Sequence, residues 1–330
     1  MLEELKGKGL LIHHWDADGI SSAYLLLKGL SDKNIVNKTP TLGNYYLTEK
    51  ELDRYSKYDY VIIVDMSLPE DDVLRLSENS DVYIFDHHLG KVIENVYHNN
   101  PIIKGGSPDD YPSASWIVNS YLGNDVNLFS ILGIVGDHEK RIKNNKKFYS
   151  IINEFCKRHN LHFDYILKIV YLLDSNYKLG DKEAVEKAPR LLFEYNSAGS
   201  ILKNKQWNEN LKKLNMEIKK QLDSPTDEID GVIMKKINTS YNIISTITRR
   251  VAWESGKNTM VINTGFFDDK DQLYVRSSKN LESMIERGKN LGFKCGGKKE
   301  VLGVIIPKDK TDSFIDEVME FLSKNKKYGE

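Results

Sequence analysis

Residues 10–19 are Leu-Leu-Ile-His-His-Trp-Asp-Ala-Asp-Gly, an apolar run that leads directly into histidines and aspartates. Runs 60–64 and 82–85 are also apolar, β-branched or aromatic, and they end at Asp65 and Asp86. Short runs of this kind are typical of strands buried in a parallel sheet. Because the carboxyl ends of parallel strands meet at one edge of an open α/β sheet, the sequence predicts that these acidic residues converge there.

The remaining pattern predicts an α/β fold in which strands alternate with helices. A second strand and a turn fall within 32–48, and residues 105–112 have the composition of a surface loop, with Ser113 as a helix cap. Helices are predicted at 20–29, 114–121 and 128–135. The last of these is predicted to end before Asp137.

Three domains are predicted from the changes in this pattern: 1–147, 148–222 and 223–330. The middle segment is mostly helical in pattern and predicts a connector whose Lys-rich faces are solvated. The last segment returns to alternating strands and helices, which predicts a smaller α/β domain. Its strands are predicted at 231–234, 260–263, 272–276 and 301–306, and its helices at 243–255, 281–291 and 311–321.

Composition narrows the class of protein. The chain has 330 residues, of which 40% are apolar, enough for two ordinary cores. A formal net charge of −1 gives no general attraction to long nucleic acid, so any polyanion must be held by local patches. Two cysteines, Cys156 and Cys295, are expected to be reduced thiols. The sequence lacks an apolar run of about 18 residues and a signal-peptide pattern, so we expect a cytoplasmic protein without a membrane partner.

Converging carboxylates require neutralisation, because like charges at close range would otherwise take up protons. A set of Asp oxygens and His nitrogens without Cys suits manganese or magnesium better than structural zinc. Mn²⁺ accepts imidazole more readily than Mg²⁺ does. We therefore expect two Mn²⁺ ions, with Mg²⁺ as the alternative.

The polar motifs follow one another in a recognisable order. The series is H-x-D-x-D-G at 14–19, Asp65, D-H-H at 86–88, G-D at 136–137, then R-S-S at 276–278 and Gly296-Gly297. It resembles the DHH phosphoesterase family, in particular its RecJ-like archaeal branch, over nearly the whole chain. D-H-H alone would be a weak signal, whereas all the motifs in order, each after a predicted strand or before a helix, make a strong one.

The resemblance implies a role for each polar residue of the first domain. One metal ion would be bound by His14 and Asp16, the other by Asp18, His87 and Asp137, with Asp65 bridging the two. Two metals about 3.5–4 Å apart lower the pKa of a shared water and clamp the attacking and leaving oxygens. Around them, Asp86 would orient the neighbouring imidazoles. His88 would face the scissile phosphate, where it could stabilise charge or protonate the leaving oxygen.

Two histidines next to these motifs have competing interpretations. His14 fits the H-x-D-x-D spacing better than His13, whose position at the end of a strand also suits a packed or hydrogen-bonded histidine. His138 follows Asp137 and could contact the metal ligands without binding a metal itself, but a surface or structural role suits it equally.

The last domain offers candidates for substrate binding. Arg276 ends a predicted strand, and its guanidinium matches phosphate or carboxylate geometry, although it could instead be a surface arginine in an ion pair. Gly296 and Gly297 would let backbone amides approach an anion, with Ser277 as a nearby donor. Many family members have a histidine after the glycines, whereas this chain has Lys298. A lysine can still capture phosphate, but it is not expected to give fine recognition of a nucleotide end.

Aromatic residues suggest a further contribution. A stacked base is worth about 1–3 kcal/mol, and tryptophans can provide the platform. The chain has four, and core packing is the expected position of most of them. They are Trp15, Trp116, Trp207 and Trp253.

The resemblance implies a Mn²⁺-dependent exonuclease that releases mononucleotides from single-stranded DNA or RNA, with 3′ to 5′ polarity and a role in DNA repair. A helicase or replication factor is a conceivable partner, but no residues identify a docking surface for one. The alternative is a small-substrate phosphoesterase acting on oligoribonucleotides, dinucleotides or nucleotide bisphosphates. A third class, an accessory factor without catalysis, is disfavoured because every expected metal ligand is present.

Overall fold

The computed structural model describes residues 2–323, apart from the side chain of Lys298. It contains two compact units, which are described separately. The first comprises the described residues up to Tyr177 together with Asp181–Leu211, and the second comprises Lys178–Gly180 and the described residues from Lys212 onward. The predicted connector 148–222 is thus shared, and most of its helices belong to the first unit. The three-part division remains a proposal.

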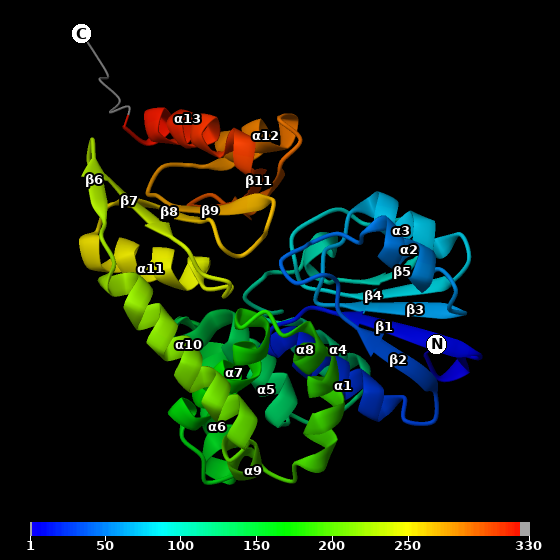
Figure 1. Ribbon diagram of the computed structural model, residues 1–330. Coiled ribbons are helices and arrows are strands. Elements are labelled where there is room, and N and C mark those ends of the chain that lie inside the picture. Colours follow the sequence, from blue (N-terminus) through cyan, green and yellow to red (C-terminus); the bar gives the residue numbers. More distant parts are fainter. Residues whose placement is uncertain (1, 324–330) are drawn as a thin grey trace. The chain divides into compact units, whose positions relative to one another are not determined.

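A parallel sheet of five strands organises the first unit (Figure 1). The order β2-β1-β3-β4-β5, with every pair parallel, confirms the predicted α/β fold. The strands are β1 (Lys8–His13), β2 (Asn34–Lys38), β3 (Tyr60–Val64), β4 (Asp81–Phe85) and β5 (Tyr97–Asn99). The direction of the strand order reverses between β1 and β3, and in such sheets the functional crevice lies beyond the carboxyl ends of the strands at this point.

Helices cover both faces of this sheet. Figure 1 shows α2 and α3 on one face and α1 and α4 on the other. The helices are α1 (Ala17–Gly29), α2 (Glu49–Tyr55), α3 (Glu70–Ser77), α4 (Ala114–Tyr121), α5 (Leu128–His138), α6 (Lys146–Arg158), α7 (Phe163–Lys178), α8 (Lys182–Leu191), α9 (Ala198–Leu202) and α10 (Lys205–Asp223), the last of which runs from the first unit into the second. Short 3₁₀ helices lie at Leu2–Glu4, Ile102–Lys104, Glu139–Asn144 and Leu192–Glu194. No helix in the described part of the chain is long and apolar enough to span a membrane.

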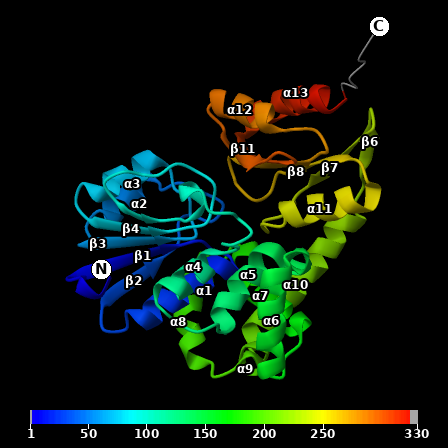
Figure 2. The same ribbon diagram turned by 180° about the vertical axis from the view of Figure 1, so that it is seen from behind.

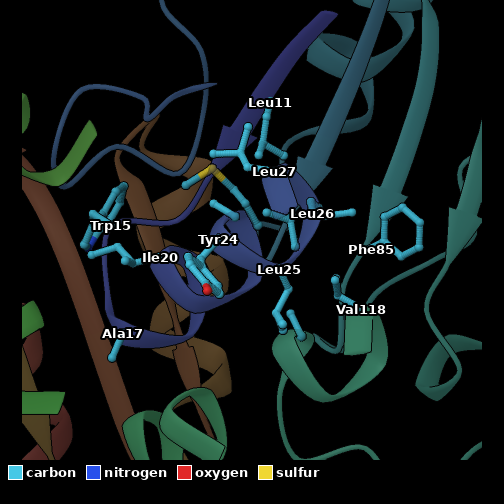
Figure 3. Close-up of a cluster of buried hydrophobic side chains, with 14 of the residues drawn as sticks. Leu11, Trp15, Ala17, Ile20, Tyr24, Leu25, Leu26, Leu27, Phe85 and Val118 are labelled. Atoms are coloured by element: carbon cyan, nitrogen blue, oxygen red, sulfur yellow. The ribbon is translucent and has the colours of Figure 1, made fainter. Parts of the chain in front are cut away.

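The core of the first unit is centred on α1. Every residue from Ala17 to Leu27 is buried, because α1 packs against the sheet and also against α4, α5 and α8. Figure 3 shows Leu26 of α1 in one cluster with Phe85 and Val118. This packing fixes the start of α1, where two of the predicted metal ligands lie.

One predicted helix end is wrong, and the correction bears on the site. Helix α5 continues to His138, so Asp137 lies on its last turn and not after it. The apolar pattern stops at Val135, but the backbone of residues 136–138 stays helical. The elements α2, α3 and β5 escaped prediction because the helices are short and polar and β5 has only three residues.

The second unit contains a mixed sheet of six strands in the order β10-β11-β9-β8-β7-β6. Its strands are β6 (Asp227–Ile229), β7 (Val232–Ile237), β8 (Asn258–Asn263), β9 (Lys270–Arg276), β10 (Lys294–Lys298) and β11 (Val301–Pro307), and its helices are α11 (Ile244–Ser255), α12 (Glu282–Asn290) and α13 (Thr311–Ser323), with a 3₁₀ helix at Lys308–Lys310. Figure 2 shows α12 and α13 on one face of the sheet and α11 on the other. Apolar side chains of β9 and β11, including Val275 and Leu302, pack with Phe314 of α13 in the core of this unit.

The Gly296-Gly297 pair belongs to the sheet of the second unit. Both glycines lie within β10 and pair with Gly303 and Leu302 of β11. A Cβ atom on Gly297 would lie 2.0 Å from the carbonyl oxygen of Val301, and its φ of +153° is unfavourable for other residues. Close pairing of the two strands therefore accounts for this glycine without a bound anion.

Candidate functional site

The polar residues of the first unit gather at the carboxyl ends of three neighbouring strands. His14 follows β1, Asp65 follows β3, and the D-H-H motif follows β4. Helix α1 begins immediately after Asp16 and carries Asp18 in its first turn, while Asp137 comes from the end of α5. The fold thus brings together residues that are more than 100 positions apart in the sequence.

One group of potential metal ligands consists of His14, Asp16 and Asp65, whose ligand atoms all lie within 4.8 Å of one another. The Nδ1 atom of His14 is 2.9 Å from Oδ2 of Asp16 and 3.7 Å from Oδ2 of Asp65. Both ring nitrogens of His14 and Oδ2 of Asp65 are buried and make no hydrogen bond with acceptable geometry. Buried polar atoms that lack a partner are costly, so converging orphaned atoms indicate a missing ligand such as a cation.

A second group consists of Asp18, His87 and Asp137. The Nε2 atom of His87 lies 3.1 Å from Oδ2 of Asp137, 3.4 Å from Oδ1 of Asp65 and 3.9 Å from Oδ2 of Asp18. Asp65 therefore presents Oδ2 to the first group and Oδ1 to the second. This is the placement that a carboxylate bridging two cations requires.

The electrostatics of the two groups agree with this interpretation. Burial and the neighbouring carboxylates raise the pKa of Asp65 well above its ordinary value. Burial, reinforced by the charge of Asp137, raises the pKa of Asp18 to about 6. Burial opposes charge on His87 as well, but contacts with Asp137 and Asp65 raise its pKa well above the usual value. Without cations Asp65 and His87 would hold protons more readily than usual, and divalent ions can replace those protons.

The backbone at Asp65 is unusual. Its φ of +58° is left-handed, a conformation that few residues other than glycine adopt, although aspartate tolerates it better than most. Its N–H still donates to the carbonyl oxygen of Phe85, at 2.9 Å. The chain turns sharply at this residue, directly after β3. Such strain is found chiefly at functional sites, where the surrounding structure holds it in place.

Asp86 and His88 form a pair next to these groups. The carboxylate of Asp86 is buried, and its Oδ1 lies 2.7 Å from Nδ1 of His88. Burial alone would raise the pKa of Asp86, but the hydrogen bond with His88 lowers it below its usual value. The buried amide of Asn100 donates to the carbonyl oxygen of His88 at 2.8 Å. Asn100 thus fixes the backbone of His88, whose side chain remains 47% exposed.

The start of α1 is held by contacts that the sequence did not reveal. The backbone N–H groups of Ala114 and Ser115, at the start of α4, donate to the two oxygens of Asp18 at 2.7 and 2.9 Å. From α7, the buried carboxylate of Asp174 accepts from the N–H of Ala17 at 3.0 Å. An acidic residue at the end of the apolar run 169–173 was the signal available for Asp174.

Replacing Asp174 with alanine is expected to weaken Mn²⁺ binding by about 10- to 100-fold, as is common for residues that support metal ligands. The change would leave the N–H of Ala17 without its partner and loosen the segment between Asp16 and Asp18. Isothermal titration with Mn²⁺ measures the effect. Asp174→Asn, which keeps an accepting oxygen, should retain most of the affinity, and the exposed Asp164→Ala on the same helix is the matched control. Equal affinity in Asp174→Ala and wild type would contradict the supporting role.

His13 and His138, for which the sequence left the role undecided, lie outside both groups. The Nδ1 of His13 donates to the carbonyl oxygen of His14 at 2.7 Å, and burial lowers the pKa of His13 to about 4. His138 bonds through Nε2 to the carbonyl oxygen of Pro112 at 3.0 Å, and burial lowers its pKa as well. Neither belongs to a group of potential metal ligands in the described part of the chain, whereas His14 does.

The predicted substrate-binding residues lie in the second unit. Arg276 ends β9, and its guanidinium carbon is 6.0 Å from the centre of the Trp253 ring. The hydroxyl of Ser277 donates to Asn258 and accepts from the N–H of Lys279, so both of its functions are used within the unit. The predicted side-chain role of Lys298 falls outside the described part of the chain.

Comparison with known proteins gives a family match and a fold. Residues 9–134 match the model of the DHH family, N-terminal domain. Among curated proteins there is no match. Solved structures include RecJ from Thermus thermophilus in complex with Mn²⁺, with a TM-score of 0.70 and 17% identity over 98% of this chain. This chain spans about half, 53%, of that RecJ chain.

Two further structures are similar along nearly their whole length. An exonuclease RecJ bound to manganese gives a TM-score of 0.68 at 16% identity, covering 98% of this chain and 93% of that one. A pGpG-specific phosphodiesterase, PggH from Vibrio cholerae, gives 0.51 at 13% identity, covering 96% and 98%. At these identities the likeness establishes a common fold.

Proposed function

From the DHH-family N-terminal domain that this chain carries, we propose that it is a two-metal phosphodiesterase. Its proposed activity is the release of mononucleotides from single-stranded DNA or RNA, with 3′ to 5′ polarity. The observation that carries the proposal is the position of Asp65, whose Oδ2 lies 3.7 Å from Nδ1 of His14 and whose Oδ1 lies 3.4 Å from Nε2 of His87. One carboxylate thus serves two groups of ligands.

The donor atoms fit divalent cations. Carboxylate oxygens and imidazole nitrogens converge without a thiolate, a set that suits Mn²⁺, with Mg²⁺ as the alternative. A pair of such ions supplies a water of lowered pKa and charge stabilisation on both sides of the phosphorus. His14 and Asp16 would hold one ion, Asp18, His87 and Asp137 the other, and Asp65 both.

Proton transfer is assigned to the His88–Asp86 pair. The contact of 2.7 Å between Nδ1 and Oδ1 places a proton between them and leaves Nε2 of His88 for the substrate. The buried carboxylate of Asp86 would orient the imidazole of His88, as a supporting acid does for a catalytic histidine elsewhere. His88 would then stabilise charge on the phosphate or donate a proton to the leaving oxygen.

Replacing His88 with glutamine is expected to lower kcat by about 10²- to 10⁴-fold, the usual contribution of a general acid. His88 could also join Asp65 and His87 in a third possible group of ligands. The Mn²⁺ affinity should nevertheless change little, because the groups of His14 and of Asp18 are complete without His88. Steady-state kinetics and Mn²⁺ titration separate the two effects. His162→Gln, which changes an exposed histidine in the same unit, is the control. An unchanged kcat in His88→Gln would remove this residue from the chemistry.

A small-substrate phosphoesterase is the second candidate. The likeness to the pGpG-specific phosphodiesterase covers 98% of that chain, so the two have similar extent. The net charge of −1 is also compatible with a substrate that carries few phosphates. Oligoribonucleotides, dinucleotides and nucleotide bisphosphates are the substrates proposed under this alternative.

The deciding experiment is a time course with Mn²⁺ on end-labelled single-stranded DNA and RNA of about 20 nucleotides, beside dinucleotides. Mononucleotides released from the long strands, absent with Asp65→Ala, would support the exonuclease, and the label that leaves first gives the polarity. Turnover confined to dinucleotides would support the second candidate. Failure to hydrolyse any of these substrates would reject both and favour an accessory role. DNA repair and a helicase or replication-factor partner remain proposals that depend on the first outcome.

A further inference from the structure

Trp253 is the most exposed tryptophan of the chain. Its exposed fraction is 63%, whereas Trp15 and Trp207 are each 3% exposed and pack in the core of the first unit. It lies near the end of α11 in the second unit. The same helix buries Ile244, Ile247 and Thr248, and Trp253 is not among the residues packed against the core of that unit. The packing of the unit therefore does not explain why this position holds a large aromatic side chain.

Two guanidinium groups flank the exposed ring. The guanidinium carbon of Arg249, one helical turn earlier, is 5.4 Å from the ring centre, and that of Arg276 at the end of β9 is 6.0 Å away. Both distances are near the outer limit of about 6 Å for cation–π contacts, which are weak at exposed sites. The two cations thus lie over the indole at long range, and the side chain still keeps 63% of its surface exposed to solvent.

The charges of both arginines also act on Tyr274. Burial raises the pKa of Tyr274, while Arg276 and Arg249 both lower it, so both guanidiniums lie close to this side chain. Tyr274 and Arg276 are two residues apart on β9 and share one face of the strand. In a chain of net charge −1, this is the kind of local cationic patch that binding a polyanion requires.

We propose that Trp253 is a stacking platform for one base of single-stranded nucleic acid, and that Arg249 and Arg276 neutralise the phosphate beside that base. The proposal rests on the proposed function and specifies its substrate as a strand with bases. An exposed aromatic ring supplies a surface that any base can stack on, and neighbouring arginines supply charge. Apolar peptides would use the ring but not the two cations, which is why nucleic acid is the favoured occupant.

The test compares strands with and without bases. The full chain carrying Asp65→Ala, which should prevent hydrolysis, is titrated with labelled single-stranded DNA of about 20 nucleotides and with an abasic strand of equal length, followed by fluorescence anisotropy. Adding Trp253→Ala is expected to weaken binding of the base-containing strand about tenfold, within the range known for one stacked base. Binding of the abasic strand should not change.

Controls separate stacking from loss of structure. Trp253→Phe should keep most of the affinity because it keeps an aromatic ring. Met216→Ala removes another exposed apolar side chain, 65% exposed, and should have no effect. Quenching of tryptophan emission by the strand should largely disappear in Trp253→Phe. The proposal is overturned if Trp253→Ala binds both strands as the parent does, or loses affinity for both equally.

Hydrolysis of strands by the wild-type protein is measured as well. This measurement shows whether a negative result rejects only the stacking platform or also the proposed function. Hydrolysis of strands by that protein, together with unchanged binding in the Trp253→Ala variant, would reject the platform alone. A protein that neither binds nor hydrolyses strands would reject the platform and the strand-acting function together.

Discussion

Replacing Asp65 with alanine is expected to abolish hydrolysis, with a loss greater than the roughly 100-fold that removal of a supporting residue can cause. Asp65 is the residue that both groups of potential ligands approach, through Oδ2 toward His14 and Oδ1 toward His87. Its removal would weaken both cation sites at once. Metal content after dialysis against Mn²⁺ should therefore fall from about two ions per chain toward none. Asp71→Ala, which removes an exposed carboxylate from α3, should match the wild type in turnover and metal content.

The same substitution should affect stability with opposite signs in the two metal states. Mn²⁺ should raise the Tm of the wild type, since a ligand bound only by the folded state stabilises it. Asp65→Ala should abolish that rise. In metal-free protein it should instead raise Tm, because burial and nearby carboxylates raise the pKa of Asp65. An acid with a raised pKa in the folded state destabilises that state increasingly as the pH rises toward the folded pKa. The gain in Tm should therefore be larger at neutral than at acidic pH. A metal-free variant less stable than the wild type would contradict the view that the clustered carboxylates destabilise the metal-free fold.

The sequence predicted the strand ends of the site because each strand has a local signal. Strands β1, β3 and β4 are short apolar runs, and the rule that links their carboxyl ends to one crevice places His14, Asp65 and His87 together. Those positions depend on the sheet alone. The resemblance to a known family added the roles of the residues, which the apolar pattern does not contain.

Contacts between residues far apart in the sequence could not be predicted from local apolar patterns. Asp174 reaches Ala17 across 157 positions, and Asn100 acts on the backbone of its neighbour in space, His88. Both are polar side chains whose partners are backbone groups. Because nearly every residue has the same backbone groups, the sequence does not show which of them a side chain will contact. The helical position of Asp137 was missed for a related reason, since polar residues can extend a helix after its apolar pattern has ended. The second sheet showed the same limit at Gly297, where strand pairing, invisible in the sequence, accounts for the glycine.

Gly133 is the second position where a small change should have a large effect. A Cβ atom placed on this residue of α5 would lie 2.0 Å from Oδ1 of Asp18 and 2.0 Å from Oγ of Ser115. Neither atom can easily move away from the added Cβ atom. Asp18 is fully buried and accepts two backbone hydrogen bonds from the start of α4, and Ser115 is bonded to Ser113 and to the carbonyl oxygen of Ser130. The added methyl group would therefore have to push α5 away from α1 and α4.

Gly133→Ala is expected to destabilise the fold by about 1–3 kcal/mol through overpacking, offset in part by up to about 1 kcal/mol from the better helix propensity of alanine. The larger consequence concerns the site. Asp137 lies four residues after Gly133, on the same side of α5, so a shift of the helix would displace one proposed ligand. The clash itself would displace another proposed ligand, Asp18. We expect Mn²⁺ affinity to fall at least about tenfold, the lower bound for a disturbed ligand shell.

Thermal unfolding and Mn²⁺ titration of the same samples separate these two effects of Gly133→Ala. The matched control is Gly199→Ala on α9, where the nearest atom to the added Cβ is Oγ of Ser197 at 3.8 Å, an ordinary contact. That variant should be as stable as the wild type or slightly more so, and should bind Mn²⁺ normally. If Gly133→Ala also retained full affinity and turnover, α5 would have room to adjust. The close packing of α1, α4 and α5 would then not be what fixes Asp18 and Asp137, and the two carboxylates would owe their positions to the cations that we propose they bind.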